Sequence, residues 1–512
     1  MQSDPAYETI PYPSFTFSQT HPDRLASMAA FLGMTPARPE KSRVLELGCG
    51  DGSNLLSFAY AMPGSDFVGV DLGKIHIDKA NAATGDLGLS NISFHCEDLM
   101  EFTRERFGEF DFILAHGLFS WVPDQVRTKV LEIYSACLAP NGVGYISYNV
   151  YPGSRIREMV WEMMQFHVAD IKDRREKVRH GRSFVKFVHD AATEPLHKAL
   201  VGNELSQFAV RTDANIFHEE FAEVNQPFYF NEFAGKLEPS GLQFLCEADP
   251  KLFNYGRVGP DARKMLDSFD SDLLSREQYF DFIKCRRFRS SLIGHSTIQL
   301  RRDPGPEILK NFLISTDVRP ASSEPNIVED IAESFVNSKG TTFQTNHSLT
   351  KAAIVILDGE SPRRIGFVDL IERSKDLIAP GSGFATSEDK EKTASFFMQL
   401  FYAGFIDLHR FQPDLVMVVS ERPAASSFAR RQVDLGSETV TTLNGTNLKL
   451  DDKLASALLL LLDGTRDVEE LNEEMKAGVA TNGLDDGDQL NPLPDKIQFV
   501  LKKFADFGLL VS

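Results

Sequence analysis

The chain has 512 residues, of which 42% are hydrophobic and 25% are charged, and its formal net charge is −19. This length is too great for one hydrophobic core, so we expect roughly two to four domains. The acidic balance argues against sequence-independent binding to nucleic acid or to an anionic membrane, because both depend on dense Lys and Arg.

The cysteine pattern and the termini indicate the compartment. The cysteines lie far apart, without C-x-x-C pairs: Cys49, Cys96, Cys137, Cys246 and Cys285. Such spacing is typical of reduced thiols, and of neither a disulfide framework nor a zinc site. The first residues lack the features of a signal peptide, and no apolar run reaches the roughly 20 residues of a membrane span. We therefore expect a soluble cytoplasmic protein without a metal.

Residues 1–42 begin with an aromatic-rich segment and continue into a helix. The helix is predicted to open at His21-Pro22, because proline is tolerated in a first turn. Its apolar residues then recur at helical spacing and are expected to pack on a sheet: Leu25, Met28, Ala29 and Leu32. Tyr12 and Phe15 either fold over a bound cofactor as a lid or are simply buried.

A buried strand and a glycine-rich turn follow. The strand 43–47 is apolar at Val44, Leu45 and Leu47. Gly48, Gly50 and Gly52 stand at alternate positions after it. Glycines allow a sharp turn and a close approach of backbone to ligand. A helix is predicted over 53–61. A second strand ends at Asp71, whose carboxylate can accept hydrogen bonds from both ribose hydroxyls.

The spacing of this turn distinguishes between nucleotides. The usual dinucleotide pattern is G-x-G-x-x-G, with a helix N-terminus facing a pyrophosphate. Here the spacing is G-x-G-x-G, Glu46 precedes it, and Asp51 lies among the glycines. Asp51 disfavours a diphosphate but suits a ligand that carries a sulfonium and an ammonium. We predict S-adenosylmethionine, with NAD or a turn without ligand as the alternatives.

Residues 43–150 alternate strand and helix, which predicts a Rossmann-like α/β fold with a parallel sheet covered on both faces. The predicted strands are 43–47, 67–71, 92–95, 110–115 and 143–149. Ligands bind at the carboxyl ends of such strands, an edge here called the mouth. Leu72 follows the second strand. After the third, Asp98 is placed to accept the adenine amino group and Leu99 to pack on the ring.

The loops after the fourth and fifth predicted strands are rich in aromatic residues. Aromatic walls with few charges attract a sulfonium weakly and exclude water, which suits methyl transfer. The residues expected to converge on the mouth are His116, Phe119, Trp121, Tyr148, Asn149 and Tyr151. His116 could accept a proton, although a structural role or a contact with the cofactor is the simpler interpretation. Trp121 could equally belong to the core.

These motifs carry a resemblance to a known family. The stretch from Glu46 to Gly52, with Asp71 and Asp98, resembles the cofactor motifs of class I S-adenosylmethionine-dependent methyltransferases. A second set is more specific: Tyr12-Pro-Ser14, His21-Pro-Asp-Arg24, His116 to Pro123 and Ser147 to Gly153. It is similar to bacterial methyltransferases with a methyltransferase regulatory domain, which include protein-lysine methyltransferases acting on outer-membrane proteins. The stretch Gly73 to Ile77 departs from the pattern, because relatives are expected to carry a Gln there.

The resemblance implies a set of site residues. Cofactor contacts are implied for Tyr12, Glu46, Gly48, Cys49, Gly50, Asp71, Leu72, Asp98, Leu99 and His116. The methyl-accepting site would involve Tyr148, Asn149, Tyr151, Trp121 and His116. No residue is a compelling general base. The chain also lacks the Asp/Asn-Pro-Pro-Tyr/Phe motif that DNA amino-methyltransferases use on a flipped base, so with its acidic charge we expect no nucleic acid. A protein substrate is what the resemblance implies.

Residues 154–301 are expected to form a largely helical regulatory region. An apolar stripe within 154–205 indicates either a helix with one solvated face or a homodimer contact. His218 and Glu219 could form a catalytic pair, although capping or packing is the simpler role. Tyr229 and Phe230 could wall a substrate channel.

The last third of the chain shows an internal repeat. Residues 302–345 are rich in proline, serine and charge and are expected to be a linker. In 346–512, two units of three helices each end in a glycine, Gly404 or Gly508, that fits a helix C′ position. A short apolar strand follows each. This pattern predicts a tandem winged-helix-like region with a structural or protein-binding role.

The predicted organisation is therefore a methyltransferase domain with an N-terminal lid segment (1–153), a regulatory region (154–301), a linker (302–345) and the tandem winged-helix-like region (346–512). The predicted function is methylation of a protein lysine amine. A small-molecule methyltransferase and a non-catalytic module that binds the cofactor are the alternatives.

Overall fold

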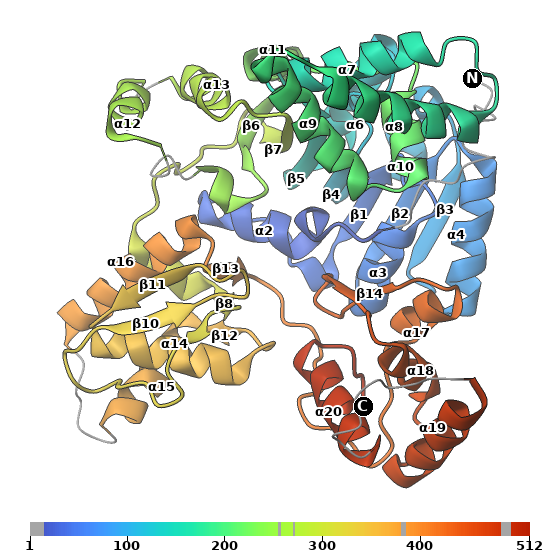
Figure 1. The fold of residues 1–512 in the computed structure, drawn as a ribbon. Coiled ribbons are helices and arrows are strands. Elements are labelled where there is room, and N and C mark those ends of the chain that lie inside the picture. Colours follow the sequence, from blue (N-terminus) through green and yellow to red (C-terminus); the bar gives the residue numbers. More distant parts are fainter. Residues whose placement is uncertain (1–14, 254–257, 270–271, 380–385, 483–492) are drawn as a thin grey trace.

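The computed structural model describes the whole chain except residues 1–14, 254–257, 270–271, 380–385 and 483–492 (Figure 1). Tyr12, one of the expected cofactor residues, lies outside the described part. Within the described ranges, none of the helices combines the length and the apolar character that crossing a lipid bilayer requires.

A seven-stranded sheet forms the centre of the N-terminal half, with the order β3-β2-β1-β4-β5-β7-β6. Its strands are β1 (Arg43–Leu47), β2 (Asp66–Asp71), β3 (Ile92–Cys96), β4 (Phe110–Ala115), β5 (Leu138–Asn149), β6 (Leu242–Glu247) and β7 (Phe288–His295). The first five strands pair in parallel, and β7 and β6 add antiparallel strands at the β5 edge. The Rossmann-like prediction is confirmed, except that β5 begins at residue 138.

Helices cover both faces of the sheet. One face carries α2 (Pro22–Phe31), α3 (Ser53–Ala61) and α4 (Lys74–Asp86), and the other carries α6 (Asp124–Cys137) and α11 (Phe230–Leu237) (Figure 1). A short helix, α5 (Arg104–Phe107), precedes β4. Because side chains alternate along a strand, Val44 packs under α2 to α4, whereas Leu45 and Leu47 face α6 and α11. The predicted helices at Pro22 and over 53–61 are confirmed.

Residues 154–301 form a helical lobe, but they also return to the sheet. The helices are α7 (Ser154–His167), α8 (Arg174–Ala191), α9 (Pro195–Ala209), α10 (Asp213–Glu220), α12 (Pro260–Asp267) and α13 (Leu273–Lys284). Helices α7 to α10 share a small core that includes Val160, Met164 and Val178. Strands β6 and β7 complete the main sheet, so the expected boundary at residue 153 does not separate two cores.

The expected linker is folded. Residues 306–412 form a unit with β8 (Leu313–Thr316), β9 (Arg319–Pro320), β10 (Glu333–Val336), β11 (Thr342–Thr345), α14 (Ser348–Glu360), β12 (Ile365–Gly366), α15 (Phe367–Ile378), α16 (Ser387–Ala403) and β13 (Ile406–His409). Strand β8 is central in the sheet β12-β8-β13, and Phe312, Ile314 and Phe335 are buried. Strands of two to four residues carry little periodic signal, so the composition revealed only the turns between them.

The C-terminal unit is built from α17 (Ser427–Asp434), β14 (Thr439–Thr441), β15 (Asn447–Lys449), α18 (Lys453–Leu461), α19 (Val468–Asn482) and α20 (Leu493–Asp506). Gly404 after α16 and Gly508 after α20 have φ angles of 73° and 69°. The predicted glycine ends of the two helical repeats are thus confirmed.

Candidate active site

Three glycines shape the turn between β1 and α3, here called the glycine corner (residues 48–52). Gly48, Gly50 and Gly52 have φ angles of 72°, 56° and 77°, which other residues adopt at a cost. A Cβ at Gly52 would lie 2.4 Å from the Phe94 ring, whereas a Cβ at Gly50 would meet no atom within 4 Å. The corner is therefore packed on the sheet side and leaves open space beside Gly50.

Two carboxylates are oriented at neighbouring strand ends. Asp71 Oδ2 accepts a hydrogen bond from the Gly50 N–H (2.9 Å), and Oδ1 accepts one from the Gly73 N–H (2.8 Å). Asp98 Oδ1 accepts from the Met100 N–H (3.0 Å), and this bond lowers the pKa of Asp98 below its ordinary value. Both acids are fixed by backbone donors, as ligand-binding carboxylates need to be.

Glu46 is a buried acid on the α3 face of β1. Its Oε1 accepts a hydrogen bond from Asn54 Nδ2 (2.8 Å), whereas Oε2 has no partner among the described residues. Burial raises the pKa of Glu46 to about 8. A buried oxygen without a donor is costly, and a positively charged ligand group beside it would remove that cost.

His116 follows β4 and lies against Phe17, with the ring centroids 4.0 Å apart. Its Nδ1 is 3.0 Å from the Tyr145 hydroxyl. Desolvation lowers the pKa of His116 to about 4, so the ring is neutral at neutral pH. A neutral ring with this pKa is a poor base for an amine, and the packing favours the structural interpretation.

A segment of the regulatory region, residues 225–228, joins the loops after β4 and β5. The Gln226 N–H donates to the Ser120 carbonyl (2.8 Å), and Asn149 Nδ2 donates to Asn225 Oδ1 (2.9 Å). Asn149 is therefore held by the regulatory region at the end of β5.

Tyr151 and Trp121 lie in the loops that follow β5 and β4. The Tyr151 hydroxyl donates to Glu158 Oε1 (2.7 Å), the Arg155 guanidinium lies 3.8 Å from the ring centroid, and the Tyr229 ring lies 5.3 Å away. Desolvation and Glu158 raise the pKa of Tyr151 to about 12. Trp121 is half-buried, so its ring is available to a ligand in part.

Tyr148 does not reach the mouth, contrary to expectation. It is 1% exposed, its ring stacks on Phe233 (4.0 Å), and its hydroxyl lies 3.1 Å from Ser291 Oγ. Burial raises the pKa of Tyr148 well above its usual range. The two-residue period of β5 places Tyr148 on the α11 face, opposite to Asn149. Phe119 is buried in the same cluster.

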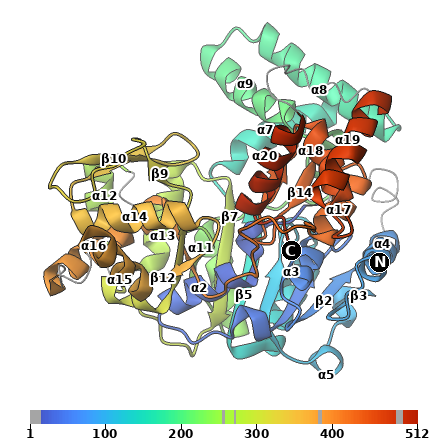
Figure 2. The same cartoon turned by 90° about the horizontal axis from the view of Figure 1, so that it is seen from below.

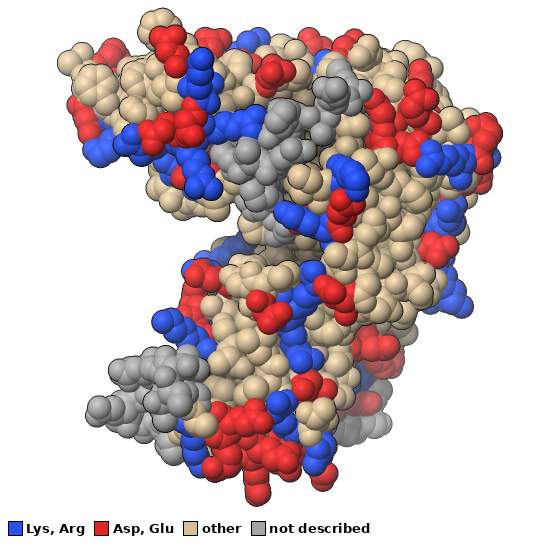
Figure 3. All heavy atoms as spheres, turned by 90° about the vertical axis from the view of Figure 1, so that its right-hand side faces the viewer, with Lys and Arg blue, Asp and Glu red and all other residues tan. Residues whose placement is uncertain are grey.

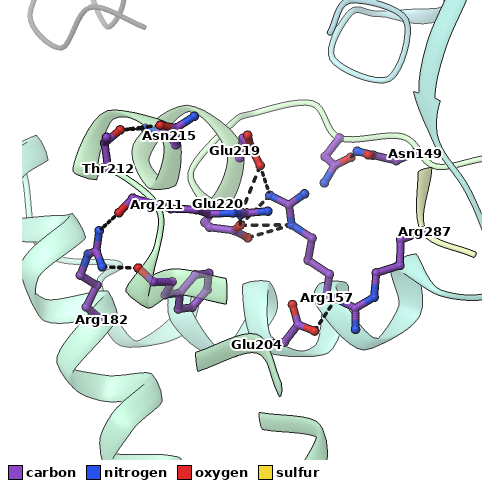
Figure 4. A network of polar contacts seen from close by, with 12 residues as sticks. Asn149, Arg157, Arg182, Glu204, Arg211, Thr212, Asn215, Glu219, Glu220 and Arg287 are labelled. Atoms are coloured by element: carbon purple, nitrogen blue, oxygen red, sulfur yellow. Dashed lines mark hydrogen bonds and ion pairs between the residues drawn. The ribbon is translucent and has the colours of Figure 1, made fainter. Parts of the chain in front are cut away.

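Charged side chains behind the mouth connect α7 and α10 (Figure 4). Arg157 pairs with Glu219 (2.7 Å) and donates from Nε to Glu220 (3.1 Å), and Arg211 also pairs with Glu220 (2.9 Å). Glu219 is thus engaged in ion pairs, which favours the packing role over a catalytic pair with His218. The network fixes α10, which precedes the 225–228 segment, to α7, which follows β5.

Comparisons with known proteins identify the family. Three family models match: "Methyltransferase domain" (residues 44–142), "Predicted methyltransferase regulatory domain" (212–295) and "PKMT, C-terminal winged helix domain" (421–505). The uncharacterized protein RP789 of Rickettsia prowazekii is 30% identical over 420 residues, which cover 80% of this chain and 75% of that protein. This chain belongs to the class I S-adenosylmethionine-dependent methyltransferases with a regulatory domain.

Two further proteins are similar to this chain. The uncharacterized protein RP028 of Rickettsia prowazekii is 33% identical over 243 residues, covering 47% of this chain and 96% of that protein. The structure of PKMT2 from Rickettsia typhi in complex with AdoHcy has a TM-score of 0.87 at 26% identity. The match covers 98% of this chain and 100% of PKMT2.

The glycine corner of this methyltransferase suits its cofactor. It combines open space beside Gly50, the Asp71 carboxylate held by backbone donors, and the buried Glu46 Oε2, which has no partner among the described residues. The Cys49 side chain lies on the sheet side near Gly69, and its N–H donates to the Val70 carbonyl (3.1 Å). Cys49 is therefore less suited to a cofactor contact than the resemblance implied.

The remaining expected residues flank the two acids. Leu72, beside Asp71, is 38% exposed, and Leu99, beside Asp98, is buried. Two residues beside the site were not predicted from the sequence. Asn54 donates a hydrogen bond to Glu46. Its part in the site could have been predicted, because it is an amide side chain in the helix directly after the glycines. Phe288, whose ring lies 6.3 Å from His116, comes from distant β7 and gave no sequence signal.

Proposed function

We propose that this methyltransferase modifies lysine side chains of a protein substrate. The supporting observation is the likeness to PKMT2, whose name abbreviates protein-lysine methyltransferase, over 98% of the chain. The "PKMT, C-terminal winged helix domain" match over residues 421–505 supports the same assignment. The proposal includes an outer-membrane protein as the substrate class, as the sequence resemblance implied.

In the proposed cofactor site, each acid has one task. Asp71 would accept hydrogen bonds from the ribose hydroxyls, Asp98 would accept one from the adenine amino group, and Glu46 Oε2 would pair with the ammonium. Leu72 and Leu99 would pack on the adenine ring, and the backbone of the glycine corner would hold the methionine part. When bound, S-adenosylmethionine supplies the methyl group.

The acceptor amine must lose a proton before it can attack. From the ordinary pKa of a lysine side chain, about 10.4, deprotonation costs roughly 4 to 5 kcal/mol at neutral pH. Desolvation lowers the pKa of an amine. We assign this effect to the half-exposed aromatic residues near the mouth, Trp121, Tyr229 and Phe288, with neutral His116. Asn149 and Tyr151 would orient the amine.

Labelled S-adenosylmethionine tests the proposal. The full chain is incubated with a bacterial outer-membrane protein fraction, and with the same fraction after chemical acetylation of its lysines. We expect label on protein from the untreated fraction, little after acetylation, and Nε-methyl-lysine by mass spectrometry. Label in small molecules, or on protein regardless of acetylation, would contradict the lysine assignment. The Asp71→Ala variant controls for contaminating activity.

The charge of the winged-helix unit fits protein contacts better than nucleic acid. Acidic side chains gather at the lower end of the face in Figure 3, where this unit lies. On α19, the exposed residues include Glu469, Glu470, Glu473 and Glu474. Such a surface repels phosphates. We propose a structural or protein-binding role.

We also propose a homodimer through the helical lobe, and a cytoplasmic location. Large apolar side chains are exposed on α7 to α9 and just beyond: Phe166 (85%), Phe187 (65%), Leu196 (67%) and Val210 (83%). Exposed apolar side chains of this size are candidates for burial in an interface. Light scattering of Phe187→Asp beside the native chain tests the dimer. All five cysteines are unpaired, which fits a reducing compartment.

A further inference from the structure

The wing of the C-terminal unit lies against the start of the methyltransferase domain. We call residues 439–449, which form β14, β15 and their turn, the wing hairpin. Figures 1 and 2 place β14 beside α3. Thr16, which is 2% exposed, has its hydroxyl 3.0 Å from that of Thr441, and Asn447 Nδ2 donates to the Thr16 carbonyl (2.8 Å).

The peptide group between Thr16 and Phe17 is held from both sides. Its carbonyl accepts from Asn447, and its N–H, on Phe17, donates to Asn54 Oδ1 (2.9 Å). Asn54 in turn donates from Nδ2 to Glu46 Oε1 (2.8 Å). Hydrogen bonds therefore run without a break from the wing hairpin to the buried acid of the glycine corner.

The wing hairpin is itself firmly placed. The Thr441 N–H donates to Gln432 Oε1 (2.7 Å), which ties the hairpin to α17. Helix α17 contacts the methyltransferase domain through the Ser427 N–H, which donates to the Tyr60 hydroxyl (3.1 Å). Gly445, with a φ of 72°, lies close to His21, because a Cβ at this position would be 2.8 Å from the imidazole ring.

We propose that Asn447 is a positioning residue for cofactor binding. It fixes the Thr16–Phe17 peptide, and this peptide places the Phe17 ring on His116 and orients Asn54 toward Glu46. Without the Asn447 amide donor, the buried carbonyl of Thr16 loses its hydrogen-bond partner. The segment around residues 16–17 then shifts, and the Glu46 carboxyl in the glycine corner is no longer held in one orientation. The winged-helix unit thereby contributes to the affinity for the cofactor although it lies outside the glycine corner.

The test uses the full chain and AdoHcy as the probe. Asn447→Asp keeps the side-chain shape but removes the donor. We expect the Kd for AdoHcy, measured by calorimetry, to rise about tenfold. The KM for S-adenosylmethionine should rise by a similar factor, with kcat within about twofold. The melting temperature of the unliganded chain should fall by only a few degrees, because one buried carbonyl loses its partner. The control is Lys449→Ala on the same hairpin, whose exposed ammonium pairs with nearby Asp451.

A purely structural role would lower the melting temperature and leave the Kd unchanged, and this result would overturn the inference. So would a loss of kcat without a change in KM. If Asn447→Asp does not fold, Thr441→Val is used, which removes the hydroxyl pair with Thr16 together with the contacts of the same hydroxyl to Gln432 Nε2 (3.1 Å) and Asn447 Oδ1 (3.3 Å). A two- to threefold rise in Kd supports the inference, and no change overturns it. Because AdoHcy binding needs no acceptor, failure of the lysine proposal would leave this test intact.

Discussion

Asp23 and Arg364 form a buried ion pair of 3.0 Å across 341 positions of the chain. Asp23 lies in the first turn of α2, in the methyltransferase core. Its carboxylate also accepts hydrogen bonds from His409 Nδ1 (2.7 Å) and from the N–H groups of Arg410 (2.7 Å) and Phe411 (2.9 Å). Burial opposes its ionisation, but Arg364 and His409 hold the pKa of Asp23 well below its usual range. The unit 306–412 is thus bonded to the start of the chain.

Replacing Arg364 should therefore destabilise the whole chain. Arg364→Met leaves the Asp23 carboxylate buried without its cation, and loss of one partner of such a pair costs about 3 kcal/mol. Urea unfolding measures the change in free energy. The neighbouring Arg363 is exposed, so Arg363→Met should cost less than about 0.5 kcal/mol. Equal effects of both variants would contradict a dominant role of the pair.

A chain that ends near residue 300 should not fold stably. The sequence predicted a linker over 302–345, and a chain cut at a linker would still bind the cofactor. The structure shows that truncation would remove the partners of Asp23 and of Arg24, which pairs with Asp407 (2.8 Å). We expect aggregation in size-exclusion chromatography and no cooperative melting. A monodisperse product that binds AdoHcy would refute this expectation.

Asp71→Ala should abolish cofactor binding. The change removes the proposed ribose acceptor and leaves the Gly50 and Gly73 N–H groups without the carboxylate. Hydrogen bonds to a charged group contribute enough for a rise of roughly 100-fold or more in the Kd for AdoHcy by calorimetry. Asp66→Ala, at the exposed start of the same strand, is the matched control and should bind normally. Near-normal affinity of Asp71→Ala would exclude the ribose assignment.

Cofactor binding should release a proton from Glu46. In the free protein its raised pKa of about 8 keeps the carboxyl protonated at pH 7. An ammonium beside Oε2 favours the carboxylate, so the affinity for AdoHcy should increase as the pH rises from 6 to 8. Calorimetry at pH 7 in buffers of different ionisation enthalpy should give roughly one proton released. The number of protons released should fall toward zero in Glu46→Gln. The same number in both proteins would rule out Glu46 as the source.

Tyr148→Phe should leave turnover within about twofold, because the ring belongs to the core. Loss of the hydroxyl contact to Ser291 should cost about 1 kcal/mol of unfolding free energy. Tyr148→Ala should cost roughly 3 to 5 kcal/mol, since it leaves a cavity beside Phe233. Turnover and urea unfolding are measured on the same preparations. A tenfold loss of kcat in Tyr148→Phe with unchanged stability would return Tyr148 to the active site.

The sequence predicted local features well and long-range ones poorly. The glycine corner, Asp71 and Asp98 could be placed because a strand, a turn and a strand end are contiguous in the chain. The face of Tyr148 was missed because strand β5 is buried on both sides, so its composition shows no alternation. The partnership of Asn149 with Asn225, and the return of β6 and β7 to the sheet, depend on segments far apart in the chain.

Strand β7 is synthesised long after β5, its neighbour in the sheet. Tyr148 on β5 and Ser291 on β7 are 143 positions apart. At translation rates of 5 to 20 residues per second, the β5 edge stays uncovered for roughly 7 to 30 s after it leaves the ribosome. An unpaired apolar strand edge is a template for aggregation. The nascent chain therefore passes through an interval in which a chaperone that binds extended apolar segments would raise its yield.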